Sequence, residues 1–326
     1  MASPADTLSD RTLKALRVSE SRYRRLFETA RDGILLLNAD TAQIEDVNPY
    51  LIEMLGYSHA EFLGKKLWDV GSFSDRPESK EMFAELQTKG YVRYEDLPLK
   101  TKAGAEIPVE FVSNTYDCEG IKVIQCNIRN ITERKQMEHQ VRQLALYDTL
   151  TKLPNRRLLN DRLSQTMAAS KRGSCYGALM FLDLDNFKSL NDTHGHGIGD
   201  LVLIEAAHRL KSCVREIDTV ARFGGDEFVV ILSDLNADKA ESTSQAEMAA
   251  EKIRVTLSGP YLLTIKHEGK AETTVEHHCT VSIGVALFIN HEASQDDILK
   301  WADTAMYQAK EAGRNLIRFS DAKARV

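Results

Sequence analysis

Two carboxylates, Asp226 and Glu227, directly follow a pair of glycines, Gly224 and Gly225. Apolar runs flank the glycines, so residues 220–232 predict a β-hairpin whose two turn residues are Gly224 and Gly225. Glycine leaves the backbone open to the close approach of a bulky ligand. The two acids then lie at the mouth of the hairpin, where they could hold a divalent cation against a phosphate. Taken alone, the same residues also fit a solvated turn with two surface acids.

A further acid comes from a distant part of the chain. Residues 178–185 form an apolar run that includes Asp183 near its end, and they predict a buried strand that finishes in two acids. From this strand onward the order strand-helix-strand-strand-helix-strand is ferredoxin-like. The first strand of such an antiparallel sheet lies beside the third, so Asp183 should meet Asp226. The pair predicts a Mg²⁺ or Mn²⁺ site completed by phosphate and water; the alternative is strand-end acids neutralised by lysines.

The remaining elements of this half follow from apolar periodicity and from turn residues. We expect helices over residues 156–172, 200–216, 243–258 and 295–312, a loop over 186–199, and strands over 260–267, 273–288 and 316–319.

Two motifs of this half resemble the GGDEF family, the diguanylate cyclases that join two GTP into cyclic di-GMP. One is Gly-Gly-Asp-Glu-Phe at residues 224–228. The other is Asp-Thr-Leu-Thr-Lys-Leu-Pro-Asn-Arg-Arg at 148–157, which matches the entry motif of the family. The resemblance spans residues 148–320 and implies Mg²⁺- or Mn²⁺-dependent condensation of GTP.

The resemblance also implies a role for individual residues at the metal and the nucleotide. Asp183 and Asp226 correspond to metal ligands, assisted by the backbone carbonyl of Leu184. Glu227 corresponds to the residue that supports the metal or takes the proton from the attacking 3′-hydroxyl. The implied GTP-binding residues are Asn191, Asp200, Lys188, Lys310, Arg314, Gly224 and Gly225.

Some of these assignments have a physical argument beside the resemblance. Asp200 can accept from both the ring N–H and the amino group of guanine, a pair that adenine lacks, so GTP should bind better than ATP. Asp200 also fits a helix N-cap. Lys310 and Arg314 are four residues apart on the predicted last helix, which places both cations on one face.

A candidate regulatory site precedes the hairpin. Arg215 and Asp218 form an R-x-x-D sequence at the spacing of the inhibitory product site of the family. Arginine can grip a guanine edge or a phosphate in a forked geometry, and aspartate can accept from guanine. The alternative is an exposed ion pair of little energetic value.

The first half of the chain has a different order of expected strands and helices. Short strands, short helices and then three longer strands, at 91–99, 106–115 and 121–131, resemble a PAS sensor domain. We expect a helical lead-in at 1–17, the PAS domain at 18–132, a helical linker at 133–147, the cyclase domain at 148–320 and a tail at 321–326. The fold class is therefore α+β, with an antiparallel PAS sheet, a linker helix and a ferredoxin-like GGDEF domain.

The ligand of the PAS domain is unknown. Leu67 stands where flavin-binding relatives have a reactive cysteine, and residues 77–90 lack the histidine of haem-binding relatives. We expect His194 and His196 to serve the loop rather than a metal. In the linker, Met137, Val141 and Leu144 approach heptad spacing, which favours a rod shared between two chains over a solvated helix.

The composition limits the partners. The formal net charge of −6 argues against nucleic-acid binding. We expect no membrane contact and a cytoplasmic location, because we find no apolar run long enough for a membrane span and no signal peptide. The five cysteines have no C-x-x-C spacing.

Together these features predict a PAS-regulated diguanylate cyclase that acts as a homodimer, with GTP as substrate and cyclic di-GMP as product and inhibitor. The alternatives are a catalytically silent receptor for cyclic di-GMP or GTP, and a cyclase with relaxed base choice.

Overall fold

The computed structural model describes residues 4–74, 78–265, 273–289 and 293–320. The chain divides into two compact units, Met1–His139 and Gln140–Val326, which we describe separately. The predicted tail, 321–326, lies outside the described residues. No helix in the part of the chain that the structure describes combines the length and the apolar character that crossing a bilayer requires.

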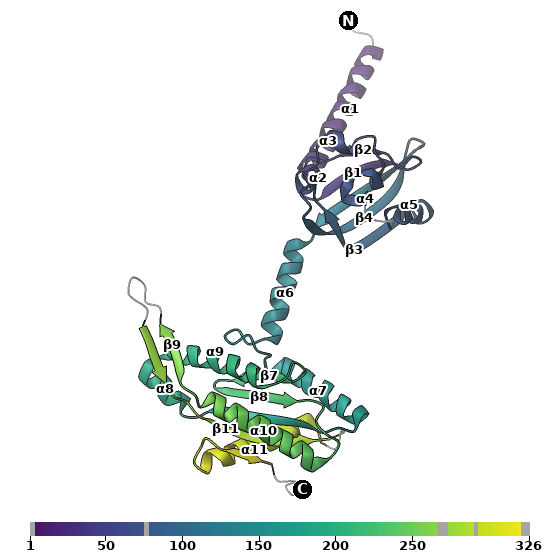
Figure 1. Ribbon diagram of the computed structural model, residues 1–326. Coiled ribbons are helices and arrows are strands. Elements are labelled where there is room, and N and C mark those ends of the chain that lie inside the picture. Colours follow the sequence, from purple (N-terminus) through teal and green to yellow (C-terminus); the bar gives the residue numbers. More distant parts are fainter. Residues whose placement is uncertain (1–3, 75–77, 266–272, 290–292, 321–326) are drawn as a thin grey trace. The chain divides into compact units, whose positions relative to one another are not determined.

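The N-terminal unit is built on a five-stranded antiparallel sheet in the order β2-β1-β5-β4-β3 (Figure 1). Its strands are β1 (Gly33–Asn38), β2 (Ile44–Val47), β3 (Tyr91–Lys100), β4 (Glu106–Cys118) and β5 (Ile121–Asn130). Its helices are α1 (Pro4–Thr29), α2 (Pro49–Leu55), α3 (His59–Phe62), η1 (Leu67–Asp69), α4 (Gly71–Ser74) and α5 (Glu78–Lys89). The order of two strands, short helices and three long strands is the one predicted from the sequence.

A buried asparagine, Asn48, joins three elements of this unit. Its side-chain oxygen accepts from the N–H of Leu51 and so caps α2, and it also accepts from the N–H of Ile34 on β1. Its amide nitrogen donates to the carbonyls of Phe27 and Asp32. All of its polar groups are therefore used, which offsets the cost of burying them.

The linker helix, α6 (Thr132–Leu146), begins at the exit of this sheet. Asn130 accepts from the N–H of Thr132 at 2.9 Å. Arg129 forms a forked ion pair with Asp32, with its shortest N–O distance 2.6 Å. The predicted linker helix is thus present, and the side chain of Asn130 at the end of β5 binds its first residue.

The C-terminal unit contains a second five-stranded sheet in the order β12-β11-β6-β8-β7 (Figure 1). Its strands are β6 (Gly177–Leu184), β7 (Thr219–Gly224), β8 (Glu227–Leu232), β11 (Val281–Phe288) and β12 (Ile317–Phe319). A separate hairpin pairs β9 (Tyr261–Ile265) with β10 (Thr273–His277). The helices are α7 (Arg156–Gly173), α8 (Phe187–His194), α9 (His196–Cys213), α10 (Lys239–Leu257) and α11 (Gln295–Glu311).

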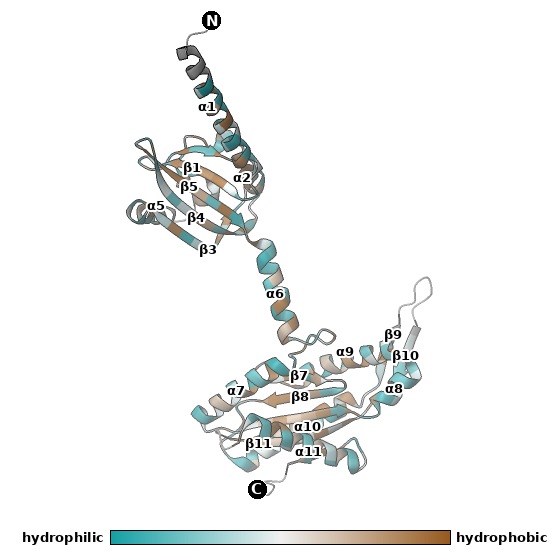
Figure 2. Cartoon of the chain, turned by 180° about the vertical axis from the view of Figure 1, so that it is seen from behind, coloured by the Kyte–Doolittle hydropathy of each residue, from teal (hydrophilic) through white to brown (hydrophobic). Residues whose placement is uncertain are grey.

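This sheet is ferredoxin-like, as predicted, because β6 lies between β8 and β11 and all four core strands are antiparallel. Alternate residues of β6 enter two different cores. Met180 and Leu182 pack with residues of α9 and α10, whereas Leu179 and Phe181 pack with residues of α7 and α11. Helices therefore cover both faces, and every residue of β6 is buried. Figure 2 shows the apolar colour of these inner strands.

Two of the predicted elements of this unit, a loop and a strand, are wrong. Residues 186–199 do not form a loop, because they contain α8 and the start of α9. The segment contains three glycines, but only Gly195, with φ 81°, separates the two helices. Residues 273–288 do not form one strand, since they divide into β10 and β11. Residues 266 and 267 of the predicted strand 260–267 lie outside the described residues.

Candidate active site

The turn of the signature hairpin is Gly225-Asp226, one residue later than predicted. Gly224 is the last residue of β7 and pairs with Glu227, and the register shifts between Arg222 and Gly224. Gly225 has φ 51°, a region that glycine enters without strain. The prediction missed this because a strand bulge cannot be seen in an apolar pattern. Both glycines are exposed, and a Cβ at either would meet nothing within 4 Å, so the turn presents bare backbone.

The end of β6 lies directly beside this turn. Asp183 is the register partner of Glu227 across the β6–β8 ladder. The N–H of Leu184 donates to the backbone carbonyl of Asp226 at 3.3 Å. The structure therefore brings together Asp183, Leu184, Asp226 and Glu227, from segments some forty residues apart, at one edge of the sheet.

These acids are crowded and partly removed from water. Burial raises the pKa of Asp183 above its ordinary value, and the charges of Asp226 and Asp185 act in the same direction, although Lys310 opposes them. Burial also raises the pKa of Glu227, as do the nearby charges of Asp183, Asp303 and Asp226. Negative charge is thus in excess at this edge.

Lys310, in the last turn of α11, is the cation that the structure places on this cluster. Its Nζ lies 2.7 Å from Oδ2 of Asp183, with 28% of the lysine side chain and 9% of the aspartate side chain exposed. The alternative prediction, strand-end acids neutralised by lysine, therefore describes the arrangement without a bound cation. A lysine at this position also indicates that the site accepts positive charge.

The donor set fits a hard divalent cation. Carboxylate and carbonyl oxygens are the ligands that Mg²⁺ and Mn²⁺ prefer. Among the residues that the structure describes, no group of three or more His, Cys, Asp or Glu side chains is arranged to hold a metal. A cation at Asp183 and Asp226 would therefore need oxygens from the backbone and from substrate.

The second acid at the end of β6, Asp185, has a different task. It is 4% exposed and accepts from the hydroxyls of Thr280 and Ser282, both at 2.7 Å, and from the N–H of Asn315 at 3.0 Å. Its two oxygens are therefore engaged with the protein. Asp185 joins β11 and the segment before β12 to the end of β6, and it is not available as a metal ligand.

The predicted base-reading residues lie on two neighbouring helices. Asn191 is on α8, and its Oδ1 is buried with no hydrogen-bond partner among the described residues. A Cβ at Gly199 on α9 would overlap this oxygen, so Asn191 rests against the residue that precedes Asp200. Asp200 is exposed and is not an N-cap, because α9 begins at His196. Because Asp200 lies inside α9 and does not cap it, its exposed carboxylate is available to bind a ligand.

The predicted phosphate-binding cations are not arranged as expected. Arg314 does not share a helix face with Lys310, since α11 ends at Glu311 and Arg314 has φ 64°. It lies in a left-handed turn whose next residue, Asn315, donates to Asp185. Lys188 is exposed on α8. These three cations come from two separate segments of the unit.

The R-x-x-D residues lie in the turn between α9 and β7, away from the signature hairpin. Asp218 has 2% of its side chain exposed and accepts from the backbone N–H of Arg215 and of Ser233, both at 3.0 Å. Arg215 has 55% exposed and also donates to the carbonyl of Ser233 at 2.8 Å. Asp218 is thus engaged with the protein, whereas the arginine is open to solvent.

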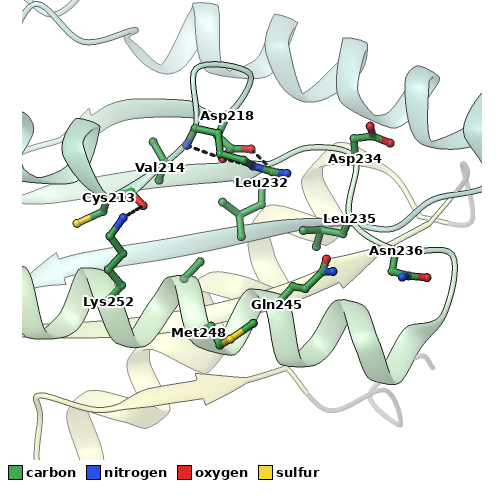
Figure 3. Close-up of a pocket in the computed structure, with 12 residues that line it drawn as sticks. Cys213, Val214, Asp218, Leu232, Asp234, Leu235, Asn236, Gln245, Met248 and Lys252 are labelled. Carbon is green, nitrogen blue, oxygen red and sulfur yellow. Dashed lines mark hydrogen bonds and ion pairs between the residues drawn. The ribbon is translucent and has the colours of Figure 1, made fainter.

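A cavity of about 430 Å³ adjoins this turn (Figure 3). Asp218 and Leu232 lie on its sheet side, and Gln245, Met248 and Lys252 of α10 lie on the other. A second cavity of about 370 Å³ includes Arg215 and Asp218 as well. The turn therefore has room for a ligand on both sides.

The sequence did not reveal that one arginine, Arg222, binds both the signature turn and the entry motif. We call this arrangement the clamp. The guanidinium of Arg222 on β7 donates to the carbonyl of Gly225, with its shortest distance 2.7 Å, and to both oxygens of Asp148, at 3.1 and 3.2 Å. Asp148 begins the entry motif, directly after α6. In the same motif, Asn155 donates to the carbonyls of Ala145 and Leu146 at the end of that helix.

Asp303 on α11 was also missed. It is seven residues before Lys310, a spacing of two helical turns that places both on one face of α11. The spacing was visible in the sequence, but only the fold shows that this face meets the acids of the hairpin.

Comparison with known proteins agrees with these two units. Residues 145–316 match the family model described as diguanylate cyclase, GGDEF domain, and residues 31–133 match a PAS domain. The chain belongs to the GGDEF diguanylate cyclase family and carries a PAS domain before the GGDEF domain.

Individual relatives are similar over different lengths. The chain is 31% identical to the diguanylate cyclase DgcM of Escherichia coli over 95% of this chain and 71% of that protein. It is 41% identical to the bifunctional diguanylate cyclase/cyclic di-GMP phosphodiesterase MucR of Pseudomonas aeruginosa, over 56% of this chain and 25% of MucR. The chain thus spans only a quarter of that longer relative.

A solved structure of the coiled coil and GGDEF domain of DgcB from Caulobacter crescentus, in complex with c-di-GMP, is also similar. It is 30% identical, covers 58% of this chain and 93% of its own, and has a TM-score of 0.49.

Proposed function

We propose that this chain is a diguanylate cyclase that condenses two GTP into cyclic di-GMP with release of two pyrophosphates, under the control of its PAS domain. The observation that carries the proposal is the position of Asp183 beside the Gly225-Asp226 turn, with Glu227 as its register partner. The membership of the family and the similarity to DgcM support the same activity.

Different residues at this edge would bind the metal and the triphosphate. Asp183, Asp226 and the carbonyl of Leu184 would hold Mg²⁺ or Mn²⁺. The bound cation would polarise the α-phosphate and neutralise charge on the leaving pyrophosphate. Lys188, Lys310 and Arg314 would bind phosphate oxygens, and the bare backbone at Gly224 and Gly225 lets the nucleotide approach.

Proton removal and base choice fall to other side chains. Glu227, whose pKa burial raises, would take the proton of the attacking 3′-hydroxyl. Asn191 and Asp200 would read guanine, and the unpartnered buried oxygen of Asn191 supports a donor on the ligand. The exposed carboxylate of Asp200 favours GTP over ATP.

The proposed reaction requires a homodimer, because each site holds one GTP and each 3′-hydroxyl attacks the α-phosphate on the other chain. Exposed apolar residues on α6 support association with a second copy: Met137, Val141 and Leu144 are 62%, 65% and 65% exposed, at heptad spacing. Positioning and charge neutralisation would supply most of the rate.

We also propose that cyclic di-GMP inhibits the enzyme by binding at Arg215 and Asp218. The exposed guanidinium of Arg215 supports this, as do the two adjoining cavities. Because Asp218 is buried and hydrogen-bonded, its role would be to orient Arg215 rather than to contact the product. All five cysteines are unpaired, which supports a reducing, cytoplasmic compartment.

The test is to incubate the purified chain with GTP and Mg²⁺ or Mn²⁺ and to separate the nucleotides. We expect cyclic di-GMP from the wild type, none from Asp226→Ala, and weaker product inhibition in Arg215→Ala. Binding of cyclic di-GMP without turnover in the wild type would favour the silent receptor, and equal use of ATP would favour relaxed base choice.

A further inference from the structure

We propose that Lys310 is an exchangeable counterion of Asp183: it neutralises this carboxylate in the empty site and transfers to the substrate phosphates when a divalent cation takes its place. The inference rests on the proposed function, because it assumes that Asp183 holds the cation. It assigns to Lys310 a second position, on the carboxylate, in addition to its expected position on phosphate.

The first argument is the cost of an unpaired buried charge. Asp183 is 7% exposed overall, and its Oδ2 is 2.7 Å from Nζ of Lys310. Removing one partner of such a pair leaves an uncompensated charge away from water, which is strongly destabilising. The nearby charges of Asp226 and Glu227 increase this cost. The empty site therefore needs a positive charge, and Lys310 supplies it.

The second argument is that this charge occupies the position that the proposed ligand set requires. An ammonium 2.7 Å from Oδ2 covers one of the two oxygens of Asp183. Lys310 must therefore release that oxygen before Asp183 can bind a cation fully. Lysine suits such a role, because it carries a point charge on a flexible four-carbon chain, unlike the planar fork of arginine.

The third argument is that the helix itself cannot move to make room. A Cβ at Gly284 on β11 would overlap the carbonyl of Ala302 and the N–H of Met306, so the backbone of α11 lies in direct contact with the sheet. The neighbouring residues Ala302, Ala305 and Met306 are buried in the same contact. The exchange is therefore a motion of the Lys310 side chain over a fixed helix.

The exchange makes the binding of cation and nucleotide cooperative. A cation that binds alone must displace Lys310, whose side chain is 28% exposed, and leave its ammonium without an anionic partner. When GTP is present, the displaced ammonium gains a phosphate. Each ligand should therefore tighten the binding of the other by the same factor, and Lys310 should account for part of that factor.

The test uses the full chain and Mn²⁺, whose binding is measured by calorimetry or by its paramagnetic resonance, with and without a non-hydrolysable GTP analogue. Without nucleotide, Lys310→Met should bind Mn²⁺ roughly tenfold more tightly than the wild type, because a competing positive charge is gone. The same variant should bind the analogue more weakly and show less coupling between the two ligands.

Two control variants separate charge from packing and from general electrostatics. Lys310→Arg keeps a positive charge, so it should bind Mn²⁺ without nucleotide as weakly as the wild type does. Lys171→Met removes an exposed lysine on α7, outside the proposed site, and should leave Mn²⁺ binding without nucleotide unchanged. The folded state of each variant is checked by far-ultraviolet circular dichroism.

Unchanged or weaker Mn²⁺ binding in Lys310→Met would overturn the exchange. Asp183→Asn distinguishes this from failure of the proposed function. If Asp183→Asn abolishes Mn²⁺ binding while Lys310→Met leaves it unchanged, the metal site stands and the exchange is wrong. If Asp183→Asn binds Mn²⁺ as the wild type does, the metal assignment fails as well.

Discussion

Asp185→Ala should destabilise the C-terminal unit by about 4 kcal/mol. The value follows from the three donors that lose their acceptor. Thr280 and Asn315 are half-buried, so water can replace the carboxylate at a cost of about 1 kcal/mol each. Ser282 is fully buried, and leaving its hydroxyl unsatisfied beside a new cavity adds about 2 kcal/mol.

Asp185→Asn should cost only about half as much, because the amide keeps one acceptor and the Ser282 hydroxyl can rotate to accept from its nitrogen. The matched control is Asp183→Asn, the same chemical change two residues earlier. Burial and neighbouring acids raise the pKa of Asp183, so its ionised form is disfavoured in the folded unit. The Lys310 side chain that loses its partner is 28% exposed and can turn to water, so this variant should lose little stability.

The assay uses the two tryptophans of the chain, Trp68 in the N-terminal unit and Trp301 on α11 in the C-terminal unit. In a Trp68→Phe background, Trp301 fluorescence reports urea unfolding of the C-terminal unit alone, so that a single transition is fitted.

An Asp185→Ala variant within about 0.5 kcal/mol of its parent, the ordinary range of surface changes, would refute the structural role of this carboxylate. So would an Asp185→Asn variant that is more damaging than Asp185→Ala, or an Asp183→Asn variant that costs as much as Asp185→Ala.

Three further predictions concern the surroundings of the site. Gly284→Ala should cost more than about 3 kcal/mol or prevent folding, because its Cβ would overlap the backbone of α11, whereas Gly224→Ala should cost under about 1 kcal/mol; thermal unfolding compares them. Arg222→Lys should lower the turnover of GTP by more than any loss of folded protein explains, since lysine cannot bond the Gly225 carbonyl and Asp148 in a fork. A loss of turnover that matches the loss of folded protein would contradict this role of Arg222. Burial and nearby acids raise the pKa of Glu227, so the contribution of this residue to stability is fully present below its ordinary pKa and is lost as pH rises through the raised pKa. Glu227→Gln should therefore raise the unfolding midpoint at about pH 7 and leave it unchanged at about pH 4; a lower midpoint at neutral pH would refute this.

The sequence by itself determined the two-part architecture and which acids lie together at one edge of the second sheet. Apolar runs of strand length, separated by helical periods, specify a ferredoxin-like order, and that order places the first strand beside the third. The sequence alone therefore predicted that Asp183 and Asp226 lie close together. The strand β6 could be predicted because both of its faces are buried, and a strand buried on both faces requires a run of apolar residues that is visible in the sequence.

The local backbone conformation could not be predicted from the sequence. The bulge near Gly224, the left-handed turn at Arg314 and the helix over residues 187–194 were not predicted, and the residue after Arg314 is held by a hydrogen bond to Asp185, far away in the chain. Gly199, at the end of the predicted loop, lies in α9, and Asn191 packs so closely on it that no side chain would fit there.

Only the tertiary structure separated acids that look alike in the sequence. Asp183 and Asp185 stand two residues apart at the end of one strand, with side chains on the same face. Three donors from β11 and its neighbours engage one of them, and a single flexible lysine from α11 pairs with the other. The electrostatic role of a carboxylate is set by the partners that folding places around it, and those partners lie about a hundred residues away in the chain.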